Sequence, residues 1–297
     1  MIDKLEYLLA LAQERHFGRA AQACGTTQPT FSAGIKQLEE TFGVMLVERG
    51  SRFRGFTEAG ERALDWSRRI VGDMRAMRQD IGALRSDLHG QLRLAAIPTA
   101  LPMLPRLTAP FIARHAEVRL MVLSRTSNEI LATLENLEAD AGITYLDNEP
   151  LGRMVSVPLY QESYRFVSTN PEVFAGRDTV TWAELAAVRL ALLTPDMQNR
   201  RIVDHAFRAA GVVATAALES DSMTALLAHL RTGQWSGILP DYFLGTLDLG
   251  PQARALRIEA PEIVKTVGLV VPLRDPLPVL AGALLAEARR VGEQAGG

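Results

Sequence analysis

The chain has 297 residues, of which 47% are hydrophobic and 22% are charged, and its formal net charge is −2. This length exceeds that of one ordinary domain and predicts two or three compact units. The composition is that of a globular protein, which excludes a disordered chain, a collagen-like chain and a disulfide framework. The single cysteine, Cys24, cannot form an intrachain disulfide, and the five histidines lack metal-ligand spacing. We therefore expect no metal and no other cofactor.

The sequence has no feature typical of a membrane or secreted protein. No apolar run approaches the roughly 18 residues that a membrane-spanning helix needs. The opening residues include acids at positions where a signal peptide has a basic segment followed by an apolar one. We expect a cytoplasmic protein that makes no contact with a membrane.

Three helices are predicted at the start of the chain. Apolar residues recur at three- and four-residue spacing over residues 5–12, which predicts a helix with one buried face. A short second helix is expected over residues 18–24, with Gly25 at its end. Thr27 is the expected N-cap of the third helix, and Pro29 lies in its first turn, where a proline costs no helical hydrogen bond.

The third helix has one apolar face, formed by Phe31, Ile35 and Leu38, and a polar face near its start. Hydroxyl and amide side chains of this kind contact base edges and phosphates when a helix enters the major groove. The two short helices therefore predict a helix-turn-helix, although an ordinary helical pair also fits the spacing. The candidate DNA-contacting residues of the third helix are Thr27, Gln28, Pro29, Thr30, Ser32 and Lys36.

The segment after the third helix predicts a wing. Residues 44–47 and 56–57 are candidate strands, and the loop between them contains Arg49, Arg52 and Arg54 but no acid. Charge is otherwise nearly balanced, because residues 1–89 include 13 Lys and Arg against 12 Asp and Glu. An arginine-bearing hairpin beside a recognition helix can lie along the DNA backbone or in the minor groove. These three arginines are therefore further candidate DNA contacts.

A long helix is expected over residues 57–88, with Thr57 as its cap. Two sets of apolar residues repeat in it every seven positions, which is the pattern of a coiled-coil seam. The alternative is a helix packed on its own domain, but its other face is charged, which favours dimerisation. A dimer would place two recognition helices on the half-sites of a palindromic operator. The candidate dimerisation residues are Ile70, Met74, Met77, Ile81 and Leu84.

Strands alternate with helices from residue 91 onward, which predicts parallel α/β sheets. The candidate strands cover residues 91–97, 119–123, 141–144, 188–193 and 236–239. Ligands bind beyond the carboxyl ends of such strands, where helix amino-termini offer unpaired amides. Polar residues recur at these junctions, although each is also an ordinary helix cap. The candidate ligand-binding residues among them are Thr99, Ser127, Thr144 and Thr194.

The segment after Thr194 adds Gln198, Asn199 and Arg200 near the expected start of a helix. Arginine matches planar anions, so these side chains are candidates for binding a small carboxylate. A solvated helix face explains them equally well, and the nearby Asp221 would repel an anion. No Ser/His/Asp arrangement and no glycine-rich phosphate loop is visible, so we do not expect an enzyme. A solute-binding or enzymatic α/β protein is the competing hypothesis.

A family resemblance covers the first third of the chain. The ungapped segments are FGRAAQAC (residues 17–24), TQPTFS (27–32), IKQLEE (35–40), FGVMLVER (42–49) and FTEAG (56–60). Together they resemble the winged helix-turn-helix of LysR-type transcription regulators. The chain departs from the family pattern at Val47 and Phe56, which stay apolar, and at Gly18, where the family commonly has a capping Ser or Thr. Glycine is nearly as good a cap, so none of these departures puts the fold in doubt.

The resemblance implies an α/β protein with a winged helix-turn-helix, a long linker helix and an effector domain similar to periplasmic binding proteins. The implied boundaries are 1–58 for the DNA-binding domain, 59–89 for the linker helix and 90–297 for the effector domain. The effector domain would consist of one subdomain of about 90–161 and 266–297, and another of about 162–265, crossed twice by hinge strands.

The resemblance also implies a function. Thr99, Ser127 and Thr194 would face a small-molecule effector in the cleft between the subdomains, and the protein would bind double-stranded promoter DNA. Family members are usually tetramers built from two kinds of dimer contact, and RNA polymerase is a further expected partner. Residues 50–56 and 194–201 look similar to a subgroup associated with formate-oxidation operons, so a small carboxylate is a candidate effector.

Overall fold

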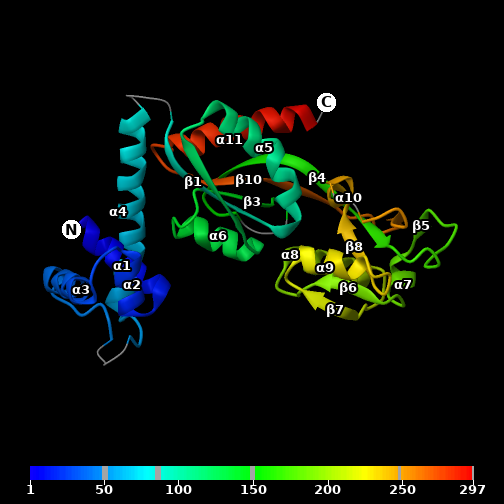
Figure 1. The fold of residues 1–297 in the computed structure, drawn as a ribbon, viewed down its shortest axis with the longest axis horizontal. Helices are drawn as coiled ribbons and strands as arrows, with labels where there is room; N and C mark the ends of the chain where they lie inside the picture. Colours follow the sequence, from blue (N-terminus) through cyan, green and yellow to red (C-terminus); the bar gives the residue numbers. More distant parts are fainter. Residues whose placement is uncertain (49–52, 84–87, 148–150, 247–248, 296–297) are drawn as a thin grey trace. The chain divides into compact units, whose positions relative to one another are not determined.

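The computed structural model describes the whole chain except residues 49–52, 84–87, 148–150, 247–248 and 296–297. The chain divides into two compact units, Met1–Asp87 and Leu88–Gly297, which we call the amino-terminal and carboxy-terminal units. The first is helical and the second combines sheet and helices (Figure 1). Within the described residues, no helix is long and apolar enough to cross a membrane.

The amino-terminal unit packs its helices around a single apolar core. Buried side chains in this core include Leu8 and Leu11 from the first helix and Phe31, Ile35 and Leu38 from the third. These are members of the predicted apolar faces, and the structure confirms the helix-turn-helix followed by a long helix. The helices are α1 (Ile2–Glu14), α2 (Phe17–Ala23), α3 (Gln28–Phe42) and α4 (Glu58–Ala83).

The start of α3 is capped as the sequence predicts, but the start of α2 is not. The Thr27 hydroxyl accepts the amide of Thr30 at 3.4 Å, and Pro29 lies in the first turn. In α2 the expected cap, Gly18, already lies inside the helix. His16 caps it instead, because its Nδ1 accepts the amides of Gly18 and Arg19 at 3.1 and 3.3 Å.

The described part of the wing contains one antiparallel bridge, between Val47 and Phe56, in place of the two predicted strands. Thr57 follows and caps α4, accepting the amide of Gly60 at 3.0 Å and donating to the carbonyl of Met45 at 2.6 Å. The first turn of α4 therefore lies against the wing backbone. A Cβ atom on Gly60 would lie 2.0 Å from the carbonyl oxygen of Leu46, so only glycine fits there.

The carboxy-terminal unit is built on a sheet with the strand order β2-β1-β3-β10-β4-β8-β6-β7. The pairs β1–β2, β1–β3, β6–β7 and β6–β8 are parallel, as predicted, whereas β10 and β4 are antiparallel to their neighbours. The strands are β1 (Gly90–Ala96), β2 (Val118–Ser124), β3 (Ala141–Tyr145), β4 (Met154–Ser168), β5 (Thr179–Val180), β6 (Leu190–Leu193), β7 (Ala216–Ser220), β8 (Ser236–Pro240), β9 (Arg254–Ile258) and β10 (Val264–Pro272).

The long strand β4 links two halves of this unit. Residues 154–163 pair with β10 in the first half, and residues 164–168 pair with β8 and β9 in the second half. The first half also contains β1 to β3, and the second contains β5 to β7. Strand β4 was not among the strands predicted from the sequence.

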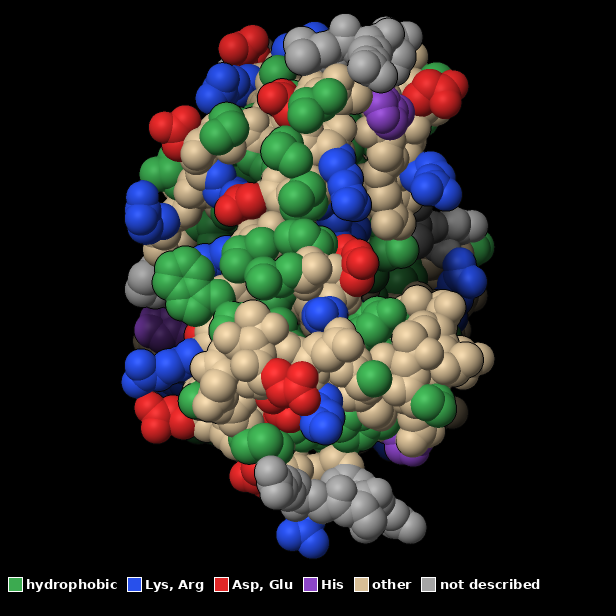
Figure 2. Space-filling model, turned by 90° about the vertical axis from the view of Figure 1, so that its left-hand side faces the viewer, with side chains coloured by type: hydrophobic (Ala, Val, Ile, Leu, Met, Phe, Trp, Pro, Cys, Tyr) green, Lys and Arg blue, Asp and Glu red, His purple; other side chains and the backbone are tan. Residues whose placement is uncertain are grey.

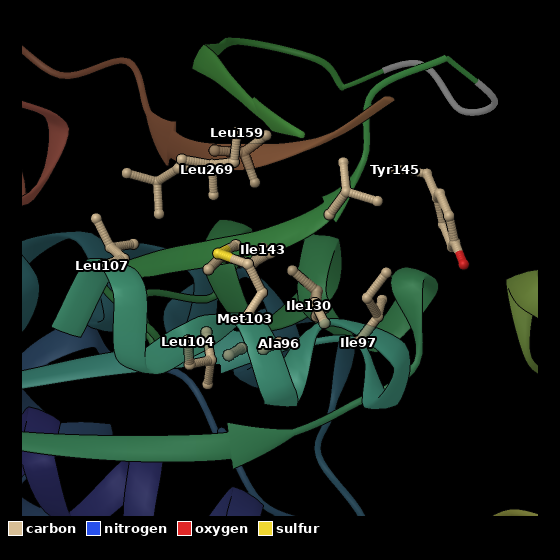
Figure 3. Close-up of a cluster of buried hydrophobic side chains, with 14 of the residues drawn as sticks. Ala96, Ile97, Met103, Leu104, Leu107, Ile130, Ile143, Tyr145, Leu159 and Leu269 are labelled. Atoms are coloured by element: carbon tan, nitrogen blue, oxygen red, sulfur yellow. The ribbon is translucent and has the colours of Figure 1, made fainter. Parts of the chain in front are cut away.

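Helices cover both halves of the sheet. In the first half, α5 and α11 lie on one face and α6 on the other (Figure 1). Figure 3 shows Met103 and Ile143 among the buried side chains of this half, whereas the hydroxyl of Tyr145 is directed away from them. Ile130 of α6 lies against Gly142, on the other face of β3. The helices are the 3-10 helix η1 (Pro98–Met103), then α5 (Leu104–Arg114), α6 (Ser127–Glu135), α7 (Trp182–Leu185), α8 (Gln198–Ala209), α9 (Met223–Leu230), α10 (Asp241–Thr246) and α11 (Val279–Ala295).

The contact between α4 and the wing can be tested at Gly60. A Gly60→Ala substitution should lower the free energy of unfolding by about 1–3 kcal/mol, because the new methyl group meets backbone that cannot rotate away. Gly245→Ala in α10 is the matched control, since no atom lies within 4 Å of the added Cβ. Thermal unfolding followed by circular dichroism measures both. Equal stability of the two variants would contradict the close approach of α4 to the wing.

Candidate DNA-binding surface and effector site

The polar face of α3 is exposed near the start of the helix. Gln28 and Lys36 are exposed and Ser32 is half-buried, and the four-residue spacing places all three on one stripe of the helix. Thr27 and Thr30 are also exposed, and their hydroxyls lie 2.9 Å apart at the helix start. Gln28, Ser32 and Lys36 therefore form one polar stripe of α3, and Thr27 and Thr30 lie at its start.

The wing is fixed to α3 by a carboxylate that the sequence analysis did not single out. Glu39 Oε1 accepts the amides of Leu46 and Val47 at 2.8 and 3.1 Å. Phe53 adds edge contacts with the rings of Phe17 and Phe56. These contacts hold the described part of the wing beside the recognition helix.

Only one of the three predicted wing arginines can be placed. Arg54 is described and exposed. Arg49 and Arg52 lie outside the described residues, and their roles stay predictions.

The predicted dimerisation stripe lies on an exposed face of α4. Ile70, Met77 and Ile81 are 41%, 48% and 51% exposed, and Met74 is half-buried. Leu84 lies outside the described residues. The buried residues Leu64 and Val71 of α4 lie on a different part of its circumference and belong to the amino-terminal core, where α4 contacts α1. Figure 2 shows hydrophobic side chains among charged ones on the face in view. These exposed apolar residues on one helix face are the pattern expected of a dimer contact.

In the carboxy-terminal unit, a chain of buried polar side chains crosses β4. Glu162 Oε1 accepts the hydroxyls of Tyr145 and Tyr164 at 2.7 and 2.6 Å. The Tyr145 hydroxyl also lies 3.3 Å from the Thr99 hydroxyl, and Asn199 Nδ2 donates to the Tyr164 hydroxyl at 3.3 Å. We call these five residues the Glu162 network. Two predicted effector residues, Thr99 and Asn199, form its two ends.

The directions of these hydrogen bonds follow from counting protons. Each tyrosine hydroxyl has one proton, and both are used on Glu162. Tyr145 must therefore accept from Thr99, as Tyr164 accepts from Asn199. Tyr160 donates to the second oxygen, Glu162 Oε2, at 3.5 Å, so both oxygens of this buried carboxyl have hydrogen-bond partners. The network joins η1 and β3 in the first half, through β4, to α8 in the second half.

Burial dominates the electrostatics of the network. It raises the pKa of the Glu162 carboxyl above its usual range, while hydrogen bonds from the tyrosines act in the opposite direction. Burial, and then the nearby Glu162 charge, raise the pKa of the Tyr145 and Tyr164 hydroxyls. The tyrosines therefore remain proton donors to the carboxyl.

Five predicted effector residues lie outside the network, and three of them are hydroxyl side chains. Ser127, the first residue of α6, and Thr194, after β6, have buried hydroxyl oxygens without a hydrogen-bond partner among the described residues. Thr144 is buried in β3 directly before Tyr145, so its side chain points to the other face of the sheet. Unpartnered buried hydroxyls are uncommon and are consistent with a ligand that completes them.

The remaining two predicted effector residues already have partners within the chain. Arg200 donates to Asp204 at 2.9 Å, to Glu219 at 2.6 Å and to the carbonyl of Leu193 at 2.8 Å. Gln198 Oε1 accepts from Arg201 Nε at 2.6 Å. Arg200 is thus surrounded by protein carboxylates, which favours a role in holding α8 against β6 and β7.

Tyr145, Glu162 and Tyr164 were not among the residues predicted from the sequence. A usable pattern was present, because Tyr160, Glu162 and Tyr164 recur at every second position, which puts them on one face of a strand.

Among the residues that the structure describes, no group of three His, Cys, Asp or Glu side chains is arranged to hold a metal ion.

Two family models match the chain. The model described as the LysR substrate binding domain matches residues 85–293. The model described as the bacterial regulatory helix-turn-helix protein, lysR family, matches residues 2–61. The chain is also 30% identical over 296 residues to the DNA-binding transcriptional dual regulator OxyR of Escherichia coli strain K12, a match that covers 96% of this chain and 95% of that protein.

Solved structures share the fold. Full-length OxyR from Pseudomonas aeruginosa superimposes with a TM-score of 0.76 at 24% identity, covering 99% of this chain and 96% of the other. Full-length CbnR, solved in complex with its target DNA, gives a TM-score of 0.69 at 23% identity, covering 98% and 99%. At 24% and 23% identity, these two structures show that the chain shares their fold, and nothing more.

The burial of Glu162 predicts a pH dependence. Because its pKa is raised on folding, the folded state binds this proton more tightly, so the carboxyl's contribution to stability is largest at low pH and decreases as pH rises through the folded pKa. The stability of Glu162→Gln relative to the parent protein should therefore increase as the pH rises above the ordinary range of a carboxyl. Thermal unfolding at a series of pH values tests it, with the exposed Glu135→Gln as control. A difference that stays constant or falls with pH would contradict the assignment.

Proposed function

The chain belongs to the LysR family of bacterial transcription regulators, and on this basis we propose that a small molecule bound at the Glu162 network controls its interaction with promoter DNA. The observation that supports this proposal is the hydrogen-bonded chain from Thr99 to Asn199 across β4. An effector that bonds to either end changes the relative free energies of the arrangements of the two halves. Differential binding to those arrangements is what allows a ligand to change DNA affinity.

DNA recognition would use the polar stripe of α3. We assign base contacts to Gln28 and Ser32, with Thr27, Pro29 and Thr30 beside them at the exposed helix start. We assign backbone contacts to Lys36, Arg54 and the other two wing arginines, because cations contact phosphates regardless of sequence. Promoter DNA as the target implies action in the cytoplasm, with RNA polymerase as an expected further partner.

These two roles can be separated by mutation. Gln28→Ala should reduce the preference for the target over unrelated DNA by about 1–3 kcal/mol, because a base contact is lost. Arg54→Gln should weaken binding to all DNA and lower the slope of log affinity against log salt by about one. Fluorescence anisotropy titrations on target and scrambled duplexes at several salt concentrations measure both effects. An equal loss of specificity in the two variants would contradict this division.

Dimerisation would use the exposed stripe of α4, and a second contact between dimers would give a tetramer. Met77→Glu should break the α4 contact, because it places a charge in the middle of the apolar seam, and Met77→Leu should preserve it. Sedimentation velocity reports the mass, and a mobility shift on a two-half-site duplex reports DNA affinity. If Met77→Glu keeps the mass and DNA affinity of Met77→Leu, the stripe does not form the dimer.

The signal that controls this protein is better explained by binding of a small molecule than by oxidation of a thiol. Relatives include a protein named as a hydrogen peroxide-inducible genes activator. Here the only cysteine is Cys24, in the amino-terminal unit, so the carboxy-terminal unit has no thiol to oxidise. Burial, and then the nearby Glu6, raise the pKa of Cys24 and so reduce its reactive thiolate fraction.

Small carboxylates are the effector class to test first. The unpartnered hydroxyls of Ser127 and Thr194 offer donors, and each lies close to a helix start, where amides favour anions. Gln198 is a third polar group near the start of α8. The resemblance inferred from residues 50–56 and 194–201 makes formate the first compound to test. Arg200 would contribute to this site by orienting α8.

The deciding experiment is a mobility shift of the full-length protein on DNA from its own genomic upstream region. It includes excess nonspecific competitor and is run with and without formate and other small carboxylates. We expect competitor-resistant binding that one of these compounds alters, and loss of that response in Thr99→Val and Asn199→Ala, while both variants still bind DNA. No specific binding, or a response that persists in both variants, would contradict the proposal.

A further inference from the structure

A groove of about 600 Å³ runs beside α8 in the second half of the carboxy-terminal unit. One wall is α8, and the other is the segment of residues 261–265, which leads into β10. The volume is that of a site for a small organic molecule. No residue of the Glu162 network lines this groove, so it is separate from the effector site proposed above.

The α8 wall combines cations with an apolar floor. Arg201, His205 and Arg208 are spaced by four and three residues, which places them on one side of the helix. Ile202 and Ala206 lie between them and are buried, so they form the floor. A ligand in this groove meets apolar surface below and basic groups at the rim.

The opposite wall extends the same chemistry. Ile263 and Val264 add apolar surface, and Lys265 adds a cation. Glu262 is the one carboxylate among the lining residues, against Arg201, Arg208 and Lys265. An anion bound between these groups would be attracted by their positive charges.

Neighbouring contacts position these groups. Arg201 donates to the carbonyl of Asp196 at 2.7 Å as well as to Gln198, which fixes its guanidinium at the edge of the groove. The nearest acid on α8, Asp204, pairs with Arg200, which does not line the groove. The positive charge of the groove is therefore not cancelled by that carboxylate.

We propose that this groove is a second ligand site, which binds an organic anion with an apolar body, such as an aromatic carboxylate. The apolar floor accommodates the body, and the cations at the rim pair with the carboxylate. Lys265 lies directly opposite Glu162 in the pairing of β10 with β4. A ligand held between α8 and Lys265 therefore acts one strand away from the Glu162 network.

The test uses three probes of nearly equal size: benzoate, benzyl alcohol and benzylamine. Binding to the full-length protein is titrated by saturation-transfer NMR. We expect benzoate to bind at least about fivefold more tightly than benzyl alcohol and benzylamine to bind most weakly, because only benzoate pairs with the cations. Raising the salt concentration from about 50 to about 300 mM should weaken benzoate binding several-fold. Equal affinity for the three probes, or no benzoate binding, would overturn the proposal.

Variants locate the site. Arg201→Gln and Lys265→Gln should each weaken benzoate binding about fivefold, with little effect on benzyl alcohol. Arg208→Gln, at an exposed position, repeats the test where folding is not at risk. Arg106→Gln, which removes an exposed cation of α5 outside the groove, is the matched control and should bind benzoate like the parent protein. Unchanged benzoate affinity in all three groove variants would overturn the proposal.

A further variant distinguishes the two proposed sites. If Thr99→Val abolishes benzoate binding, the probe occupies the Glu162 network, and the groove proposal fails while the proposed function stands. If benzoate binds in the groove but no compound alters DNA binding, the groove stands and the proposed function fails.

Discussion

The carboxy-terminal unit depends on one constraint, the burial of the Glu162 carboxyl in the strand shared by its two halves. A buried carboxyl is tolerated only when its oxygens are fully hydrogen-bonded. Tyr145 and Tyr164 donate to Oε1 of this carboxyl from different strands, and Tyr160 donates to Oε2 at 3.5 Å. The hydroxyls of Tyr145 and Tyr164 in turn contact Thr99 and Asn199. Through these hydrogen bonds, the Glu162 carboxyl is connected to Thr99 in η1 and to Asn199 in α8. A change at either end of this chain of bonds must be compensated elsewhere in it.

Local chemistry explains which elements could be predicted. Thr27 and Pro29 determine where α3 begins, and the alternation of strands and helices after residue 90 predicts the α/β architecture. By contrast β4 was missed, because Gln161, Glu162 and Ser163 make its centre polar, and a polar stretch resembles a loop until its partners are known. The cap of α2 was misassigned, since His16 is an unusual residue in that position.

The candidate site was predictable only in part, for a related reason. Thr99 and Asn199 were found because they follow strands, where ligands bind in this architecture. Their connection through Glu162 is tertiary and depends on residues far apart in the chain. The same holds for Arg200, whose partners Asp204 and Glu219 change a candidate ligand contact into an internal ion pair. Similarity to relatives identifies the family, while the effector is selected by such individual side chains.

The most direct test of the Glu162 network is a double-mutant cycle on Tyr145→Phe and Tyr164→Phe. Both hydroxyls donate to the same oxygen of Glu162, so removing one should change the cost of removing the other. Urea denaturation of the parent protein, the two single variants and the double variant gives the coupling free energy. The network predicts a coupling of at least about 0.5 kcal/mol. Additivity within about 0.3 kcal/mol would show that the two hydroxyls act independently and would contradict the network as the link between the halves.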